Sequence, residues 1–271
     1  MTKVKKFAFC YDFDGTLCPE YMMNHNLLPD CKVDPKIFWQ KVVNYSNLNK
    51  CDPTLAYLKL LMIEMKKSKI GFSRSVFKKY GRIIILFKGV ESWFQKIEEK
   101  IKKKFNVKLE HYIISSGLEE MIKGCKISKN IKKIFASSYI FNKDFIWPKL
   151  SVNYSNKVQF LYRIHKGKFD VFDNAGVNNK IEDKKVYIPF ENIFFFGDGE
   201  TDIPTFVVNK KNGGTSICVY ENDETSKKNA KKLLREKRVN FIVENDYSEN
   251  GPIENLINTI MKLNIDFSIS S

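Results

Sequence analysis

Two aspartates near the start of the chain, Asp12 and Asp14, are spaced so that their carboxylates could act together. They follow an apolar run, residues 7–11, that is typical of a buried β-strand. Because side chains alternate along an extended chain, both carboxylates would lie on the same side. Two adjacent carboxylates repel each other, so a bound cation or a retained proton has to compensate. An acidic turn closed by Gly15 is the simpler alternative.

Two later apolar runs also end in small or acidic polar residues. The run at 112–114 leads into Ser115, Ser116 and Gly117, and the run at 193–196 leads into a segment with Asp198 and Asp202. Any one of these clusters could cap a loop. In a parallel sheet, however, the carboxyl ends of the strands share one edge, where ligands bind. Several carboxylates, a hydroxyl and glycine turns at that edge suit Mg²⁺ and a phosphate.

The elements that would position these clusters alternate between strand and helix. Further strands are expected within 131–141, at 216–220 and at 239–243, and helices at 156–165 and from about residue 252. Other helices are expected after Gly89 and Leu118. This alternation predicts an α/β fold with a doubly wound parallel sheet.

Two segments depart from the alternation. Residues 18–87 hold two helices that begin at Pro35 and Pro53, each after an aspartate that can cap the helix. Within them, the run at 83–87 could be a strand or a buried connector. Residues 166–190 are polar and rich in loops, with room for a small hairpin.

The charge and length restrict the class of protein. The chain has 271 residues, of which 43% are hydrophobic, enough for a full core and a second small unit. Its formal net charge is +15, but 41 of its 46 basic residues are lysines. Nucleic-acid surfaces rely heavily on arginine, so we interpret the excess as a compositional bias and expect no nucleic-acid partner. The charge would still favour encounters with small anionic substrates.

The cysteines, histidines and apolar runs predict the setting. Six cysteines and three histidines are scattered, without a spacing that suggests a zinc site. No apolar run is long enough to cross a membrane, and too few apolar residues precede Asp12 for a signal peptide. We therefore expect a reducing, cytoplasmic setting.

Together the motifs resemble those of the haloacid dehalogenase-like (HAD) hydrolase superfamily, nearest to its phosphoserine-phosphatase-like branch. Residues 12–16 match the first motif, 113–117 the second and 197–202 the fourth. Lys157, at the start of a helix, is the best match to the third motif. Three other lysines are alternatives there: Lys149, Lys166 and Lys168. The likeness spans residues 7 to about 208.

The resemblance implies a role for each of these positions. Asp12 would attack phosphorus and form an aspartyl-phosphate, and Asp14 would act as general acid and then as general base. The phosphate would be bound by Ser115, Ser116, Gly117 and Lys157. Mg²⁺ would be held by the Asp12 carboxylate, the Asp14 backbone carbonyl and Asp198, with Asp202 binding through water or orienting Lys157.

The same resemblance implies a Rossmann-like catalytic core, residues 1–17 and 88–271, and a helical cap, residues 18–87, that closes over the site. The expected function is that of a Mg²⁺-dependent phosphomonoesterase of a small phosphorylated metabolite. Phosphoryl transfer to a second acceptor, or non-catalytic binding of nucleic acid, are the alternatives. Phosphoserine phosphatases grip an amino acid with a glutamate and a cap arginine, and the candidates here are Glu20, Arg74 and Arg82.

Overall fold

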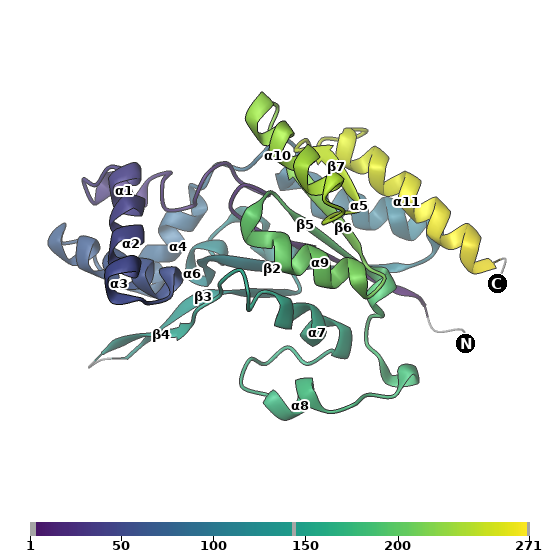
Figure 1. The fold of residues 1–271 in the computed structure, drawn as a ribbon, viewed down its shortest axis with the longest axis horizontal. Helices are drawn as coiled ribbons and strands as arrows, with labels where there is room; N and C mark the ends of the chain where they lie inside the picture. Colours follow the sequence, from purple (N-terminus) through teal and green to yellow (C-terminus); the bar gives the residue numbers. More distant parts are fainter. Residues whose placement is uncertain (1–3, 143–144, 270–271) are drawn as a thin grey trace.

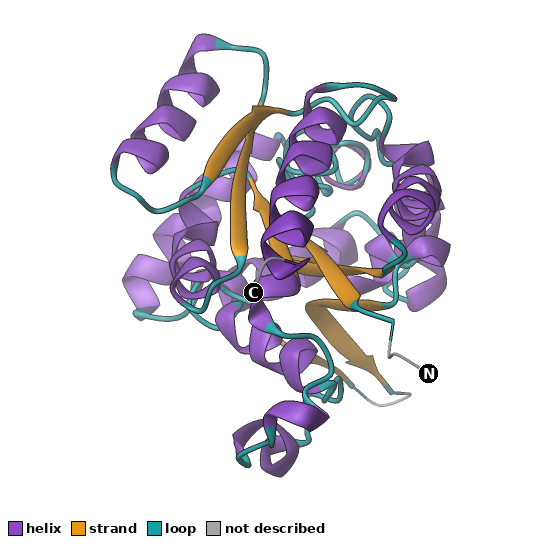
Figure 2. Ribbon diagram, turned by 90° about the vertical axis from the view of Figure 1, so that its right-hand side faces the viewer, coloured by secondary structure: helices purple, strands orange, loops and turns teal. Residues whose placement is uncertain are grey.

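The computed structural model describes residues 4–142 and 145–269 and has a seven-stranded sheet at its centre (Figures 1 and 2). The strand order is β4-β3-β2-β1-β5-β6-β7, in which β4 is antiparallel to β3 and the other neighbours are parallel. The strands are β1 (Lys6–Tyr11), β2 (Lys108–Leu118), β3 (Lys133–Phe141), β4 (Ile146–Leu150), β5 (Ile193–Gly197), β6 (Thr215–Tyr220) and β7 (Phe241–Glu244). The predicted doubly wound α/β sheet is confirmed.

Helices cover both faces of the sheet (Figure 2). The helices α5 (Val90–Phe105) and α11 (Pro252–Ile269) pack on one face. Three others pack on the opposite face: α7 (Val158–Lys166), α9 (Ile203–Lys211) and α10 (Glu224–Arg235). The central strand β1 is therefore buried on both sides, which explains why its sequence is continuously apolar rather than alternating.

Four helices from the segment 18–87 gather at one end of the molecule, away from the two termini (Figure 1). They are α1 (Leu27–Asp30), α2 (Pro35–Asn49), α3 (Pro53–Lys67) and α4 (Arg74–Arg82). The predicted starts of α2 and α3 are confirmed, because the Asp34 and Asp52 side chains accept hydrogen bonds from backbone N–H groups of the first turn. The short helix α6 (Glu119–Ile122) follows β2 and packs against α4.

Of the two alternatives for the run at 83–87, the structure shows the connector: the run forms no helix or strand and joins α4 to α5. Ile84 is buried, whereas Ile83 and Ile85 are exposed, so the connector is only partly buried.

Two other local features differ from expectation. The edge strand β4 was not predicted, since it is short and contains a proline, which only an edge strand tolerates. The hairpin considered for residues 166–190, all of which are described, is wrong. That segment instead holds the short helix α8 (Asn174–Asn178) and 3₁₀ turns at Asp183–Lys185 and Phe190–Asn192.

A buried arginine explains how the 166–190 segment is held without a strand ladder. The Arg163 guanidinium on α7 donates to the backbone carbonyls of Asp170 and Val171 at 2.6 and 3.0 Å. These bonds satisfy carbonyls that a sheet would otherwise have to pair. In the described part of the chain, no helix is both long and apolar enough to cross a lipid bilayer.

Candidate active site

The register of the sheet brings the three polar clusters to one edge. Tyr11, the last residue of β1, is opposite Ile113 of β2 and Phe196 of β5. The residues that follow each of these therefore emerge at the same end of the sheet, next to the four helices of the segment 18–87 (Figure 1). The Asp12 backbone N–H donates to the Phe196 carbonyl at 2.9 Å, which holds this carboxylate at the junction of β1 and β5.

At the centre of the edge, Lys157 lies between two carboxylates. Its Nζ is 2.9 Å from Asp12 Oδ2 and 2.8 Å from Asp202 Oδ1, and all three side chains are buried. Burial alone would lower the pKa of Lys157, but the two carboxylates outweigh it and raise the pKa above its ordinary value. The lysine is therefore a fixed positive charge beside Asp12. It precedes α7, and its own N–H donates to the Asn153 carbonyl at 3.0 Å.

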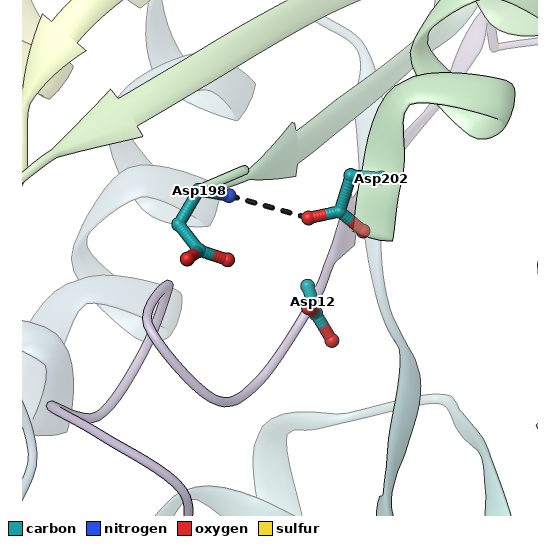
Figure 3. A group of neighbouring side chains, drawn as sticks. All are labelled: Asp12, Asp198 and Asp202. Carbon is teal, nitrogen blue, oxygen red and sulfur yellow. Dashed lines mark hydrogen bonds between the residues drawn. The ribbon is translucent and has the colours of Figure 1, made fainter. Parts of the chain in front are cut away.

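Asp198 completes an acidic group with Asp12 and Asp202 (Figure 3). One oxygen from each carboxylate lies within 4.8 Å of the others. Burial and the neighbouring carboxylates raise the pKa values of Asp198 and Asp202, because the three ionised groups would carry more negative charge than Lys157 offsets. Carboxylate oxygens are also the ligands that Mg²⁺ prefers. The donor set and the surplus of charge therefore fit a divalent cation of this kind.

Two glycines leave room for the acidic group. Gly15 has a φ of +75°, and a Cβ there would meet the Asp198 carboxylate. A Cβ at Gly197 would meet the Asp202 carboxylate. The glycine that the sequence suggested for a sharp turn is thus also required by the close approach of a site side chain.

Asp14 is half-buried on the side of the edge that faces α1 to α4. Its Oδ1 accepts a hydrogen bond from the Met22 N–H at 2.9 Å. Burial and the nearby Asp12 carboxylate raise the pKa of Asp14 from 3.8 to about 7. One carboxyl of the pair is thus favoured in its protonated form, as the repulsion argument predicts.

The segment Ser115–Gly117 lies in an irregular stretch of β2, where the register with β3 shifts between Ser115 and Leu118. The Ser115 hydroxyl oxygen is buried and accepts a hydrogen bond from the Gly117 N–H at 3.0 Å. The Ser116 carbonyl accepts a bond from the Tyr57 hydroxyl at 2.6 Å, which ties α3 to this stretch. A Cβ at Gly117 would approach Asp14 Oδ2 to 3.1 Å, so the segment lies beside that carboxyl.

The other candidates lie elsewhere. Among the alternative lysines, Lys149 and Lys168 are exposed, and Lys166 donates to the carbonyls of Val177 and Asn179. Arg74 is exposed over the Phe141 ring, and Arg82 is exposed as well. The Glu20 carboxylate accepts a hydrogen bond from the Asn24 side chain at 3.0 Å.

A cavity of about 300 Å³ opens between the helices of the segment 18–87 and the sheet edge, and sequence reasoning missed it. Its lining includes Asp14, Ser116 and Gly117 from the edge, together with the aromatic residues Tyr21, Trp39, Tyr57 and Tyr154. Burial, and after it the carboxylates of Asp14 and Asp198, raise the pKa of the Tyr21 hydroxyl. The four aromatic residues come from separate segments, so no local sequence motif predicts that they lie together.

Comparison with known proteins supports the same fold. No protein-family model matches the chain. It is similar to an uncharacterized protein of Borreliella burgdorferi. The two are 29% identical over an alignment of 282 residues, gaps included, and the alignment covers 92% of this chain and 94% of that protein.

Several solved structures share the architecture. A HAD family hydrolase from Salmonella enterica serovar Typhi has a TM-score of 0.55 at 19% identity, covering 89% of this chain and 68% of that one. A phosphoserine phosphatase, solved as a phospho-aspartyl intermediate analogue, has a TM-score of 0.55 at 17% identity, covering 88% and 93%. A cytosolic 5′-nucleotidase bound to cytidine has a TM-score of 0.50 at 14% identity, covering 96% and 88%. The chain therefore has the fold of the HAD-family hydrolases, as its motifs predicted.

Proposed function

We propose that the protein is a Mg²⁺-dependent phosphomonoesterase that forms a phosphoryl-enzyme on Asp12. The observation that carries this proposal is the buried Lys157, held at 2.9 Å from Asp12 Oδ2 and 2.8 Å from Asp202 Oδ1, beside a third carboxylate at the same sheet edge. A purely structural ion pair would need one carboxylate, whereas this arrangement keeps an excess of negative charge next to a potential nucleophile.

In the first step, an oxygen of Asp12 attacks phosphorus as the ester oxygen departs. Lys157 offsets the repulsion between the Asp12 carboxylate and the phosphate, and stabilises charge in the transition state. The buried Ser115 hydroxyl has its oxygen engaged by the Gly117 N–H, so its proton is available to a phosphoryl oxygen. Ser116 and Gly117 would contact the phosphate next to Ser115.

Asp14 would transfer the proton in both halves of the reaction. A pKa of about 7 keeps it partly protonated near neutral pH, so it can donate to the departing alcohol. In its ionised form it can then accept a proton from the water that attacks the phosphoryl-Asp12 bond, which returns Asp12 and releases phosphate.

The acidic group would hold Mg²⁺ through Asp12 and Asp198, with the Asp14 carbonyl, while Asp202 orients Lys157 through the 2.8 Å ion pair. The cation, when bound, supplies Lewis-acid polarisation of the phosphoryl group. The segment 18–87 would act as a cap that excludes water and contacts the leaving group, because its residues line the cavity beside Asp14.

A hydrolysis screen tests this function. Phosphate release from a panel of phosphorylated metabolites is measured with Mg²⁺ and with a chelator, using Asp12→Asn as the blank. We expect release that needs Mg²⁺ and falls by more than ~10³-fold in Asp12→Asn, because the amide is not a nucleophile. Full activity in Asp12→Asn or in chelator would contradict the proposal. Phosphate release only in the presence of a second acceptor would indicate a phosphotransferase instead.

A further inference from the structure

The cavity beside Asp14 contains the space that a leaving group would occupy, if the proposed function holds. It is bounded on one side by Asp14, Ser116 and Gly117, and on the other by residues of α2 and α3. Its volume of about 300 Å³ is at the small end of ligand pockets. There is room for one small molecule next to the general acid.

The charge of the lining excludes an anionic leaving group. Asp14 is the charged residue of this cavity, and in the described part of the chain no lysine, arginine or histidine lines it. The two arginines and the glutamate considered from the sequence, Arg74, Arg82 and Glu20, are absent from the lining. A carboxylate such as that of phosphoserine would therefore be buried here without a partner, which is costly.

The apolar part of the lining is an aromatic wall. The Tyr21 and Trp39 rings have centroids 4.3 Å apart, and the Trp39 and Tyr57 rings 5.8 Å apart. Tyr154 leaves 54% of its surface exposed, and Tyr21 leaves 48%. Large aromatic surfaces left open in a pocket are typical of sites that bind a ring or an apolar group.

Three polar side chains of the lining, those of Trp39, Tyr57 and Asn153, are engaged in hydrogen bonds within the protein. The Trp39 indole N–H donates to Asn24 at 3.0 Å, and the Tyr57 hydroxyl donates to the Ser116 carbonyl. The Asn153 side chain donates to Asp52 at 2.6 Å and accepts from residues 155–156. These bonds fix the orientation of Trp39, Tyr57 and Asn153 within the wall.

From these observations we propose that the preferred substrates are phosphomonoesters of alcohols that carry an uncharged, planar aromatic ring, with the ring held against Trp39 and Tyr21. Nucleoside 5′-monophosphates and simple benzylic phosphates share this chemistry. The inference rests on the proposed function for the chemistry and on the cavity for the specificity.

Steady-state kinetics with Mg²⁺ test the substrate class. Benzyl phosphate and uridine 5′-monophosphate represent the two sources of the ring, and O-phosphoserine and phosphocholine represent an anionic and a cationic leaving group. We expect kcat/KM for at least one ring-bearing ester to exceed that for both other esters by roughly ten-fold or more. A preference for O-phosphoserine or for phosphocholine would overturn the inference while leaving the phosphatase intact.

Variants of Trp39 test whether the aromatic wall causes the preference for ring-bearing esters. Trp39→Ala should raise KM for the ring-bearing esters about ten-fold with little change in kcat, and should leave O-phosphoserine unaffected. Trp39→Phe keeps a ring and should recover most of the loss. Leu48→Ala is the matched control on the same helix, because Leu48 is 85% exposed and lies outside the cavity. An equal loss for all substrates in Trp39→Ala would contradict the assignment.

A binding measurement separates this inference from the proposed function. Calorimetric titration of benzyl phosphate into Asp12→Asn, with and without Trp39→Ala, needs no turnover. Binding that depends on Trp39, together with no phosphate release by the wild type from any ester, would refute the phosphatase and retain the ring site. Binding that is independent of Trp39 would refute the ring site.

Discussion

The sheet edge and the cavity beside it differ in the chemistry of their side chains. At the edge, four charged side chains, Asp12, Lys157, Asp198 and Asp202, are packed within a few ångströms. In the cavity, the wall is aromatic, and Asp14 is the charged side chain among the described residues that line it. The first region can move charge but distinguishes one phosphate ester from another poorly. The aromatic wall of the second region contacts the rest of the substrate and can select among esters. Reaction and selection are therefore expected to respond to different mutations.

Among variants that keep the nucleophile, the largest effect should come from removing the positive charge at the edge. Lys157→Met leaves Asp12 and Asp202 buried without their partner, which should cost about 3 kcal/mol of stability. It should also lower kcat by roughly a hundred-fold or more for every substrate, since the transition state loses a stabilising charge. Thermal unfolding and phosphate release measure the two effects. Lys166→Met is the control, because the Lys166 ammonium donates to the backbone carbonyls of Val177 and Asn179 rather than to Asp12 or Asp202. Near wild-type turnover in Lys157→Met would contradict the role of the lysine.

A second prediction concerns the backbone that supports the acidic group. Gly15→Ala forces a side chain into the left-handed region, at about 1–2 kcal/mol, and toward the Asp198 carboxylate. We expect a several-fold higher Mg²⁺ concentration for half-maximal activity, because Asp198 must shift. Titration of activity with Mg²⁺ measures this.

The control for that experiment is Gly71→Ala. Gly71 has no positive φ, and a Cβ there would meet only Val76 Cγ2, at 3.6 Å. An unchanged Mg²⁺ dependence in Gly15→Ala would show that Asp198 does not help to hold the cation.

The smallest effect concerns Asp14 and pH in the metal-free protein. Its folded-state pKa is raised from 3.8 to about 7, so the folded state binds the extra proton and loses stability as pH rises between these values. Asp14→Asn removes that penalty. The melting temperature of Asp14→Asn minus that of the wild type, measured in chelator, should therefore increase from about pH 5 to about pH 8.

Asp223→Asn is the matched control for the pH series. Hydrogen bonds from the first turn of α10 lower the pKa of this exposed capping carboxylate, so its contribution is present above 3.8 and does not change across the same range. A flat difference for Asp14→Asn would mean that Asp14 is ionised throughout.

Prediction from the sequence succeeded for polar residues that directly follow an apolar run, because the end of a strand then fixes their place in the fold. Asp12, Ser115 and Asp198 follow apolar runs, and parallel pairing then brings them to one edge. Lys157 could be chosen among many lysines only by its order in the chain, and its contacts with Asp12 and Asp202 required the structure.

The rest depends on tertiary packing. Tyr21, Trp39, Tyr57 and Tyr154 lie on four separate segments and form a wall only when these pack together. In α3, Leu55 and Leu58 have the three-residue spacing of one helix face, yet Leu58 is buried whereas Leu55 is 43% exposed. The buried Arg163 holds the start of the 166–190 segment through the backbone carbonyls of Asp170 and Val171, and hydrophobic periodicity does not reveal such contacts.

The most direct test of the account is to look for the covalent intermediate. The protein is mixed with Mg²⁺ and a substrate from the screen, quenched in acid during turnover, and digested for peptide mass spectrometry. We predict a phosphoryl group on the peptide that contains Asp12, located on that carboxylate and missing in Asp12→Asn. Rapid phosphate release with the label on another residue, or with none on Asp12 at any quench time, would contradict the central claim.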